Sequence, residues 1–193
     1  SAASDVYKRQ GQKVRNISFK VCSGEILALT GLVGAGRTET VRLLFGADIA
    51  DSGEVELDGK KLILCNPSDA INSGICLLTE DRKDQGLVLG QSIRENFGLP
   101  NLTNFSSKGW IDGNAEKGSF QNYVEKLQIK ISGHHQLASQ LSGGNQQKVV
   151  LAKWLERNAE ILIFDEPTRG IDVGAKYETV SYTHLRAHET PAN

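Results

Sequence analysis

The sequence carries almost no net charge, and this absence excludes several kinds of partner. Its 22 basic and 23 acidic residues leave a formal net charge of -1. A basic surface for nucleic acid or for an anionic membrane is therefore not expected. No apolar run approaches the roughly 20 residues that a membrane-spanning helix needs. If the protein works at a membrane, it does so through a partner.

Cysteine is scarce and methionine is missing. Cys22, Cys65 and Cys76 are odd in number and lack the spacing of metal ligands, which predicts reduced thiols with a structural role in a cytosolic protein. The lack of any methionine, even at position 1, predicts a fragment or a processed product. Residues 1–10 and 181–193 resemble translated sequencing-adaptor sequence, with frayed native termini as the alternative. We expect one truncated domain at residues 11–180, flanked by non-native tails.

The rest of the chain alternates between strand-like and helix-like segments. Residues 16–21 alternate apolar and polar side chains as a half-buried strand does, and residues 25–30 form an apolar run typical of a strand buried on both faces. Further expected features are a helix at 38–45, a hairpin turn at Asp58-Gly59, and strands at 75–78 and 161–164.

The middle of the sequence differs, because strand patterns disappear between about residues 91 and 141. One amphipathic helix is indicated there by the spacing of Phe120, Tyr123, Val124 and Leu127, and a second helix is expected around residues 149–154. The predicted fold class is α/β: a mainly parallel sheet with an antiparallel portion and an inserted helical subdomain at about 91–141.

Residues 31–38 form a glycine-rich turn between an expected strand and an expected helix, which is the context of a P-loop. Glycines allow the backbone to wrap around a phosphate, so that amide groups and the helix N-terminus face its charge. Thr38 stands where a hydroxyl ligates Mg²⁺, but Arg37 replaces the expected lysine. A strand-to-helix turn without a ligand is the alternative for this loop alone.

Two further segments strengthen the case. The apolar run 161–164 delivers the adjacent carboxylates Asp165 and Glu166 at its end, suited to holding Mg²⁺ and orienting an attacking water. Residues 141–148 place Ser142 and two glycines just before a helix, which offers a second anion-binding N-terminus. Taken singly, the first could be a surface acid pair and the second an ordinary N-cap.

In combination these segments resemble the ATPase domains of ABC transporters. Residues 141–148 are similar to the signature motif, and residues 165–172 look like a Walker B strand end running into a D-loop. Together with residues 31–39 and 80–83, they resemble the C-terminal ATPase domain of ribose, galactose and xylose importers, from about Val14 to Val180. The resemblance implies a P-loop NTPase fold of the ABC ATPase type, with ATP and Mg²⁺ as cofactors.

The resemblance also implies roles for individual residues. The nucleotide-binding residues are Gly31, Leu32, Val33, Gly34, Ala35, Gly36, Arg37, Thr38, Glu39 and Glu80. Mg²⁺ would be held by Thr38 and Asp165, with Glu166 as catalytic base and Asp172 as the D-loop acid. The signature residues, which act on ATP bound by the partner half, are Leu141, Ser142, Gly143, Gly144, Asn145 and Gln146.

The implied assembly is a bacterial sugar importer at the cytoplasmic face of the cell membrane. Its partners would be a first nucleotide-binding half in the same polypeptide, membrane permease subunits and, indirectly, an extracellular or periplasmic sugar-binding protein. The loop at 80–90 and the helical segment 91–141 would meet the permease. No nucleic acid is expected.

Two alternatives follow from departures and absences in the sequence. Arg37 and Glu80 stand where most ABC ATPases have lysine and glutamine, so a regulatory half with little turnover of its own is one alternative. A non-transport ABC ATPase of DNA repair is the other, but no heptads separate residues 80 and 141. Trp110 and Trp154 predict packing residues, and His134-His135 predicts a solvated loop pair rather than a metal site.

Overall fold

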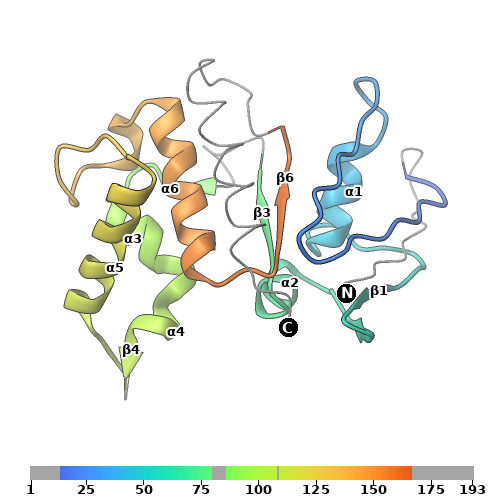
Figure 1. Cartoon of the computed structure of the whole chain (residues 1–193), viewed down its shortest axis with the longest axis horizontal. Helices are drawn as coiled ribbons and strands as arrows, with labels where there is room; N and C mark the ends of the chain where they lie inside the picture. The colour runs from blue at the N-terminus through green and yellow to red at the C-terminus, as the bar shows by residue number, and fades with distance from the viewer. Residues whose placement is uncertain (1–13, 80–85, 108, 167–193) are drawn as a thin grey trace. The chain divides into compact units, whose positions relative to one another are not determined.

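The computed structural model describes residues 14–79, 86–107 and 109–166, which fall into two compact units (Figure 1). Of these residues, the first unit holds those up to Leu77 and the second those from Leu78 onward. In the part of the chain that the structure describes, no helix is long and apolar enough to cross a membrane.

The first unit begins its regular structure with helix α1 (Arg37–Leu44). Val41, Leu43 and Leu44 bury one side of this helix, as the expected helical pattern predicts. The helix ends where Gly46 adopts a positive φ of 68°, and its amide donates to the Leu43 carbonyl at 3.1 Å. A Cβ on Gly46 would lie 2.6 Å from the Asn66 carbonyl oxygen, so only glycine fits this stop.

A tight hairpin follows, built from β1 (Val55–Leu57) and β2 (Lys60–Leu62). The strands are antiparallel, with Leu57 opposite Lys60. Between them Asp58 and Gly59 both have positive φ, at 49° and 76°. That combination is typical of the hairpin turn whose twist matches the strands. The expected turn and the expected antiparallel portion are both confirmed.

Helix α2 (Pro67–Asn72) was not expected from the sequence, although its start signal is clear. Asn66 caps the helix by accepting from the Asp69 amide, and the Asp69 carboxylate accepts from the Asn66 amide in return. Pro67 occupies the first helical position, where no amide is needed. A cap, a proline and an acidic residue at these spacings would have identified the helix. Strand β3 (Ile75–Leu78) follows and is fully buried, as predicted.

The prediction of strands at residues 16–21 and 25–30 is wrong, because neither segment is a strand in the structure. Ile17, Phe19 and Val21 are partly buried and alternate with exposed neighbours, so the expected face exists, but no strand forms. Residues 25–30 are exposed, with Ile26 at 52%. Within the described ranges neither run belongs to a sheet, and a strand requires a neighbouring strand to complete its hydrogen bonds.

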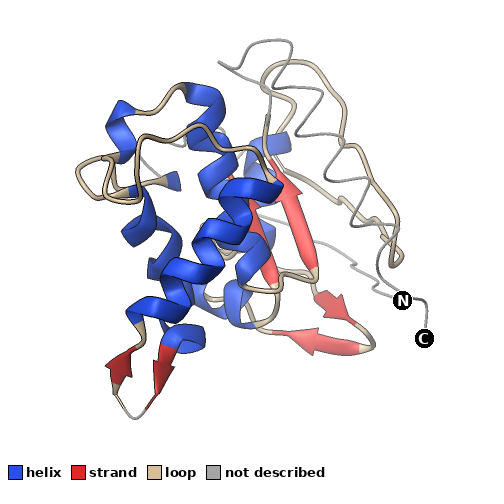
Figure 2. Ribbon diagram, turned by 60° about the vertical axis from the view of Figure 1, so that its left-hand side comes forward, coloured by secondary structure: helices blue, strands red, loops and turns tan. Residues whose placement is uncertain are grey.

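The second unit is dominated by helices (Figure 2). In chain order they are α3 (Ile93–Gly98), the 3₁₀ turn η2 (Leu99–Asn101), α4 (Leu102–Phe105), α5 (Gly113–Lys126), the 3₁₀ turn η3 (Ala138–Gln140) and α6 (Gly143–Glu156). Helices α3, α5 and α6 pack against one another. The individual helices expected around residues 120–127 and 149–154 are thereby confirmed as parts of α5 and α6.

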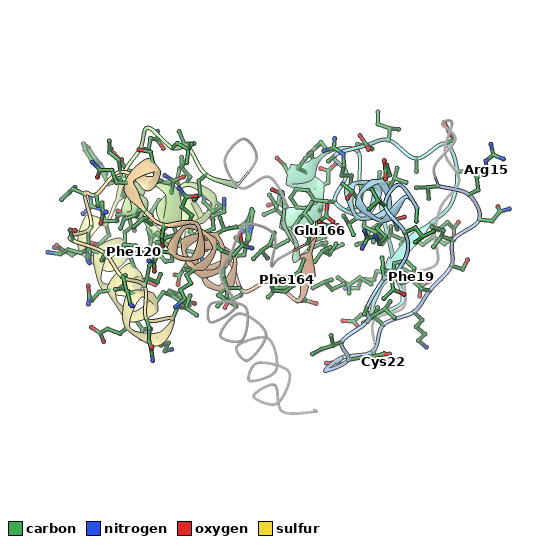
Figure 3. The ribbon with its side chains drawn as sticks, turned by 90° about the horizontal axis from the view of Figure 1, so that it is seen from above. Arg15, Phe19, Cys22, Phe120, Phe164 and Glu166 are labelled. Carbon is green, nitrogen blue, oxygen red and sulfur yellow. The ribbon has the colours of Figure 1, made fainter. Side chains whose placement is uncertain are left out.

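An aromatic cluster fills the space among these helices. Phe97 of α3 and Phe120 of α5 are fully buried, and their ring centres lie 5.1 Å apart. The Phe105 and Tyr123 rings lie 6.0 and 5.7 Å from Phe97. Figure 3 labels Phe120 among the side chains of the second unit. The amphipathic face predicted for residues 120–127 is therefore the face that packs.

A small hairpin interrupts the helices, contrary to the expectation of a strand-free middle. Strand β4 (Ser106–Ser107) pairs antiparallel with β5 (Trp110–Ile111), and Trp110 is 82% exposed. The prediction of a packing role is wrong for Trp110 and confirmed for Trp154, which is buried. The difference is positional, because Trp154 lies on a helix with a covered face whereas each hairpin strand is two residues long.

Strand β6 (Ile161–Phe164) closes the described part of the chain and forms a two-stranded sheet with β3. The Asp165 amide, one residue past the strand, donates to the Leu78 carbonyl at 2.9 Å. The expected strand at 161–164 is confirmed, although its side chains are only half-buried. The described residues thus form three two-stranded sheets: β1–β2, β3–β6 and β4–β5.

Candidate functional site

The glycine-rich turn at residues 31–38 leads into α1; its residues 31–35 are exposed, whereas Gly36 is buried. Leu32 and Val33 are 86% and 98% exposed, and Gly34 and Gly36 have positive φ values of 82° and 87°. Gly36 is the N-cap of α1, and no side chain caps the helix there. The backbone therefore takes the conformations that glycine permits, on a surface open to a ligand.

Local contacts hold this turn against the helix that it opens. The Ala35 amide donates to the Leu32 carbonyl at 3.0 Å. A Cβ added to Gly31 would lie 3.0 Å from the Ala35 Cβ, so the turn is closely folded. Buried Thr40 donates its hydroxyl to the Gly36 carbonyl at 2.7 Å. No motif singles out Thr40 for this role, although a threonine inside a helix commonly bonds the carbonyl one turn before it.

The chemistry of the turn suits an anion. The first amides of a helix carry a partial positive charge, and a phosphate at this end is favoured by both hydrogen bonding and the helix dipole. Arg37 and Thr38 begin the helix, and acidic Glu39 follows in its first turn. The predicted nucleotide-binding residues other than Glu80 lie in this turn or in the first turn of α1; Glu80 lies outside the described residues.

The second unit presents a similar helix start at α6. Ser142 is its N-cap, makes no side-chain cap, and is exposed. The Ser142 Oγ accepts from Asn145 Nδ2 at 3.1 Å, which leaves its own O–H proton for another acceptor. Asn145 Oδ1 in turn accepts from the Lys130 amide at 2.9 Å. Asn145 therefore joins the signature serine to the segment that follows α5, a link that the sequence did not indicate.

The buried side chains of Gln146 and Leu141 hold the same turn against the rest of the second unit. Leu141 is buried, and buried Gln146 donates from Nε2 to the Ala138 carbonyl at 2.9 Å. Gly143 and Gly144 form the first turn of α6. The six predicted signature residues thus form one turn at the start of α6. The side chains of Leu141 and Gln146 are buried, and the Ser142 hydroxyl lies at the surface.

The adjacent carboxylates at the end of β6 differ in exposure. Asp165 is buried at 8% exposure, whereas Glu166 is exposed. The backbone of Glu166 has a positive φ of 44°, an uncommon conformation for a non-glycine residue. The chain turns at this point, so the two carboxylates have different surroundings, as different roles require. Asp172, the predicted D-loop acid, lies outside the described residues.

The described residues contain no group of three or more His, Cys, Asp or Glu side chains that could hold a metal by themselves. The predicted Mg²⁺ ligands are of another kind, a hydroxyl on Thr38 in the first unit and a carboxylate on Asp165 in the second. Hydroxyl and carboxylate oxygens are the ligand atoms that Mg²⁺ prefers when phosphate and water complete its shell. Each predicted ligand is therefore, taken singly, of a chemical type that Mg²⁺ accepts.

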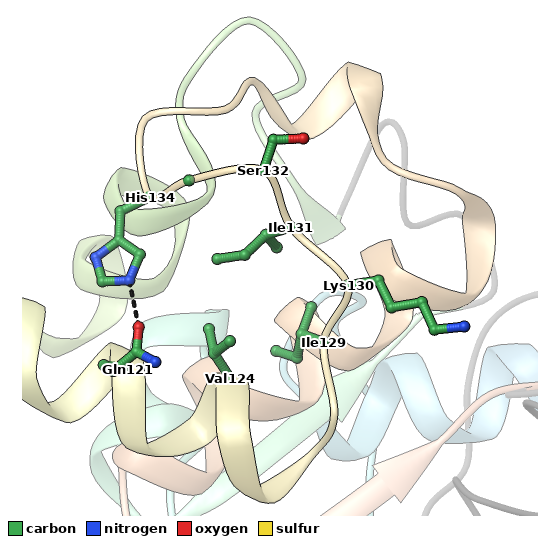
Figure 4. A pocket seen from close by; sticks show the side chains of 8 residues that line it. Gln121, Val124, Ile129, Lys130, Ile131, Ser132 and His134 are labelled. Atoms are coloured by element: carbon green, nitrogen blue, oxygen red, sulfur yellow. Dashed lines mark hydrogen bonds between the residues drawn. The ribbon is translucent and has the colours of Figure 1, made fainter.

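A shallow hollow of about 670 Å³ lies elsewhere on the second unit, between α5 and the chain that follows it (Figure 4). His134 lines it, bonded through Nε2 to Gln121 Oε1 at 2.7 Å and packed edge-on against Phe120. Burial, and then nearby Lys117 and Arg94, lower the pKa of His134. The prediction of a solvated pair holds for exposed His135 and is wrong for His134, because a buried aromatic ring covers it.

The sequence is similar to those of known proteins. The family described as ABC transporter matches residues 14–169. The ribose import ATP-binding protein RbsA of Bacillus licheniformis is 56% identical over 164 residues, which are 85% of this chain and 33% of that protein. RbsA of Bacillus subtilis is 52% identical over 163 residues, 84% of this chain and 33% of that protein. The chain spans about a third of the length of these relatives.

Solved structures agree on the fold. A nucleotide-free ATP-binding cassette from an ABC transporter has a TM-score of 0.79 at 20% identity, covering 97% of this chain and 77% of that one. A dimeric bacterial ABC transporter cassette has a TM-score of 0.76 at 21% identity, covering 91% of this chain and 75% of that one. These likenesses establish the predicted fold class.

Proposed function

The chain belongs to the ABC transporter family, and we propose that it is the second ATP-binding domain of a tandem polypeptide that drives import of a monosaccharide. The observation that carries this proposal is the pair of helix starts without a side-chain cap, at Gly36 before α1 and at exposed Ser142 before α6. Each presents amides to an anion. RbsA proteins, named for ribose import, supply the substrate class.

The proposed reaction is hydrolysis of ATP to ADP and phosphate. The backbone of residues 31–38, with Arg37, binds the phosphates, and Glu166 accepts a proton from the attacking water. The exposure of Glu166 supports its role toward water, and the burial of Asp165 supports a separate role toward a cation. Mg²⁺, held by Thr38 and Asp165, would neutralise charge on the phosphates when bound.

The Ser142 hydroxyl has a separate task in this proposal. In a head-to-tail pair of ATP-binding domains, it faces the ATP held by the P-loop of the other half. Its proton is free of the Asn145 contact, in which the oxygen accepts, and can be donated to the γ-phosphate. Because this contact forms only when the halves close, it stabilises the reacting state more than initial binding.

The proposal also includes permease subunits and a sugar-binding protein as partners. The domain would work at the cytoplasmic face of a bacterial membrane, attached through permease subunits, and a sugar-binding protein would deliver the substrate to the permease. Residues 80–90 and the helical segment 91–141 are the surface proposed to meet the permease. Glu80, in that surface, would contribute to the nucleotide site.

Uptake of labelled sugar by the complete tandem polypeptide, assembled with its permease in vesicles, tests this function. We expect ATP-dependent uptake of ribose, galactose or xylose, and loss of both uptake and phosphate release in Glu166→Gln. Asp51→Asn, at an exposed acid distant in sequence from every motif, is the matched control and should retain both activities. Phosphate release without uptake of any of the three sugars would contradict the assignment.

One alternative function is favoured by a specific residue. Arg37 keeps the charge of the expected lysine but has a planar, forked head that cannot occupy the same space. A domain that binds ATP as a regulatory ligand, with turnover confined to the other half, would tolerate this change. Equal ATP binding by wild-type and Glu166→Gln, with unaltered turnover of the tandem polypeptide, would favour this alternative.

A further inference from the structure

Residues 86–91 of the second unit are held by hydrogen bonds from three different elements. Helix α3 contributes Asn96, whose Oδ1 accepts from the Val88 amide at 2.7 Å and whose Nδ2 donates to the Val88 carbonyl at 3.0 Å. Both bonds of this pair come from one buried side chain. The bonds fix the middle of the segment against α3.

The chain around η3 holds the later part of the segment. The Ser139 amide donates to the Leu89 carbonyl at 3.2 Å, and the Ala138 amide donates to the Gln91 carbonyl at 3.0 Å. The Ala138 carbonyl accepts from Gln146 Nε2 on α6 at 2.9 Å. Residues 86–91 are therefore connected to the first turn of α6 through a single intervening residue.

Lys153, two turns further along α6, connects that helix directly to residues 86–91. Its Nζ donates to the Gly86 carbonyl, and its own backbone carbonyl accepts from Asn101 Nδ2 at 2.8 Å. The side chain is only 9% exposed, and Nζ lies 4.8 Å from the centre of the Trp154 ring. An ammonium group at such a site loses hydration, so an apolar side chain would be the cheaper choice if packing were the whole role of this position.

We propose that Lys153 is a positioning residue for the signature. Its ammonium group holds Gly86, and with it residues 86–91, at a set place along α6, the helix that begins at Ser142 and Gly143. Residues 86–90 belong to the surface proposed to meet the permease, so Lys153 sets where the signature stands relative to that surface. This inference rests on the proposed function, because it assigns the link to ATP turnover by the assembled transporter.

Amide hydrogen exchange on this chain tests the link without nucleotide or permease. We expect Lys153→Met, which keeps the stem and removes the ammonium, to speed exchange at the Val88, Ala138 and Ser139 amides at least about tenfold, since hydrogen bonds to charged groups contribute that much. Lys153→Arg should retain most of the protection. Lys126→Met, at an exposed lysine of α5, is the control and should change none of these amides.

The same experiment separates positioning from general stability. The Leu127 and Ile129 amides, bonded to Tyr123 and Val124 at the end of α5, should keep their exchange rates in Lys153→Met. Equal acceleration at these two amides would overturn the proposal, because Lys153 would then only stabilise the unit. If Lys153→Met does not fold, Lys153→Gln replaces it, with the same amides and the same two outcomes.

A second measurement addresses function in the complete polypeptide assembled with its permease. We expect Lys153→Met to lower permease-stimulated phosphate release about tenfold while the unstimulated rate changes little, and Lys153→Arg to restore the stimulation. An equal fall in both rates would overturn the positioning role. Absence of phosphate release by the wild-type assembly would instead refute the proposed function, and the exchange result would still decide whether Lys153 holds residues 86–91.

Discussion

Gly98 of α3 lies directly against the carboxylate of Glu116 of α5, so closely that a Cβ on the glycine would overlap the carboxylate oxygen. Glu116 is buried there, pairs with Arg94 at 3.4 Å, and has its pKa raised by burial. The glycine thus makes room for a charged side chain inside a helical bundle. Neither residue was indicated by the sequence, because the clash exists only where two helices cross.

We expect Gly98→Ala to lower the free energy of unfolding by about 1–3 kcal/mol, since the added methyl must displace the carboxylate. Gly118→Ala on α5 is the matched control: Gly118 is exposed, and nothing lies within 4 Å of its added Cβ. That change should raise the free energy of unfolding by about 0.5–1 kcal/mol, because alanine favours helix. Chemical denaturation measures both, and equal shifts in the same direction would contradict the packing described for Gly98.

Two asparagines donate to the end of α6 with different burial. Asn101 is fully buried and donates to the Phe97 and Lys153 carbonyls at 2.9 and 2.8 Å, whereas exposed Asn104 donates to the Glu156 carbonyl at 3.2 Å. Asn101→Ala should lower the free energy of unfolding by about 2 kcal/mol, because it leaves buried carbonyls unpaired. Asn104→Ala should cost less than about 0.5 kcal/mol, since water replaces the lost donor. Denaturant unfolding measures both variants, and equal free energies of unfolding would refute this difference.

His134 makes the stability of the second unit depend on pH. Its pKa lies below the ordinary 6.5, first because of burial and then because of Lys117, Arg94 and His135. The unfolded chain therefore binds the proton more readily than the native chain, so the free energy of unfolding falls as pH drops through about 6.5. His134→Gln should flatten this fall between about pH 7.5 and 5.5.

The control for the pH dependence is His135→Gln, at the exposed neighbour. It should leave most of the slope in place, because His135 contributes only the smallest of the four causes. NMR titration of the wild-type imidazole gives the direct measurement, with a midpoint below 6.5 expected. A midpoint at or above that value would show that His134 is solvated after all.

The division of labour between the two ATP-binding halves predicts unequal effects of two substitutions. Ser142→Ala removes the hydroxyl proposed to act on the other half's ATP, and the loss of such a donor is expected to cost on the order of 3 kcal/mol, or about a hundredfold in turnover. Arg37→Ala should weaken nucleotide binding by this domain and leave more residual turnover. Phosphate release and sugar uptake of both variants in the same assembled transporter decide the matter. Greater damage from Arg37→Ala would make this domain the principal hydrolytic site.

By itself, this chain should bind Mg-ATP weakly and hydrolyse it negligibly. The reason is that its signature acts on ATP held by another domain, and its own P-loop needs the signature of that domain. Phosphate release by the purified chain, compared with Glu166→Gln, measures this. Steady release abolished by Glu166→Gln would show that one domain suffices.

Local chemistry allowed the sequence to determine several elements before any contact was known. The Asp58-Gly59 turn follows from two residues that tolerate positive φ, and α1 ends at Gly46 for the same reason. The buried face of α5 follows from apolar spacing around Phe120, and the start of α6 follows from Ser142 and its glycines. Each depends on residues within about one or two turns of one another.

The tertiary structure alone decided what covers each segment. Residues 25–30 are apolar enough for a buried strand, yet they are exposed and belong to no sheet among the described residues, and a strand needs a second strand to bond with. Trp110 and Trp154 have the same side chain and opposite exposure, and the charged Lys153 lies buried and bonded to the Gly86 carbonyl. The chemistry of a side chain sets its free energy of burial. The neighbours that bury it come from distant parts of the chain.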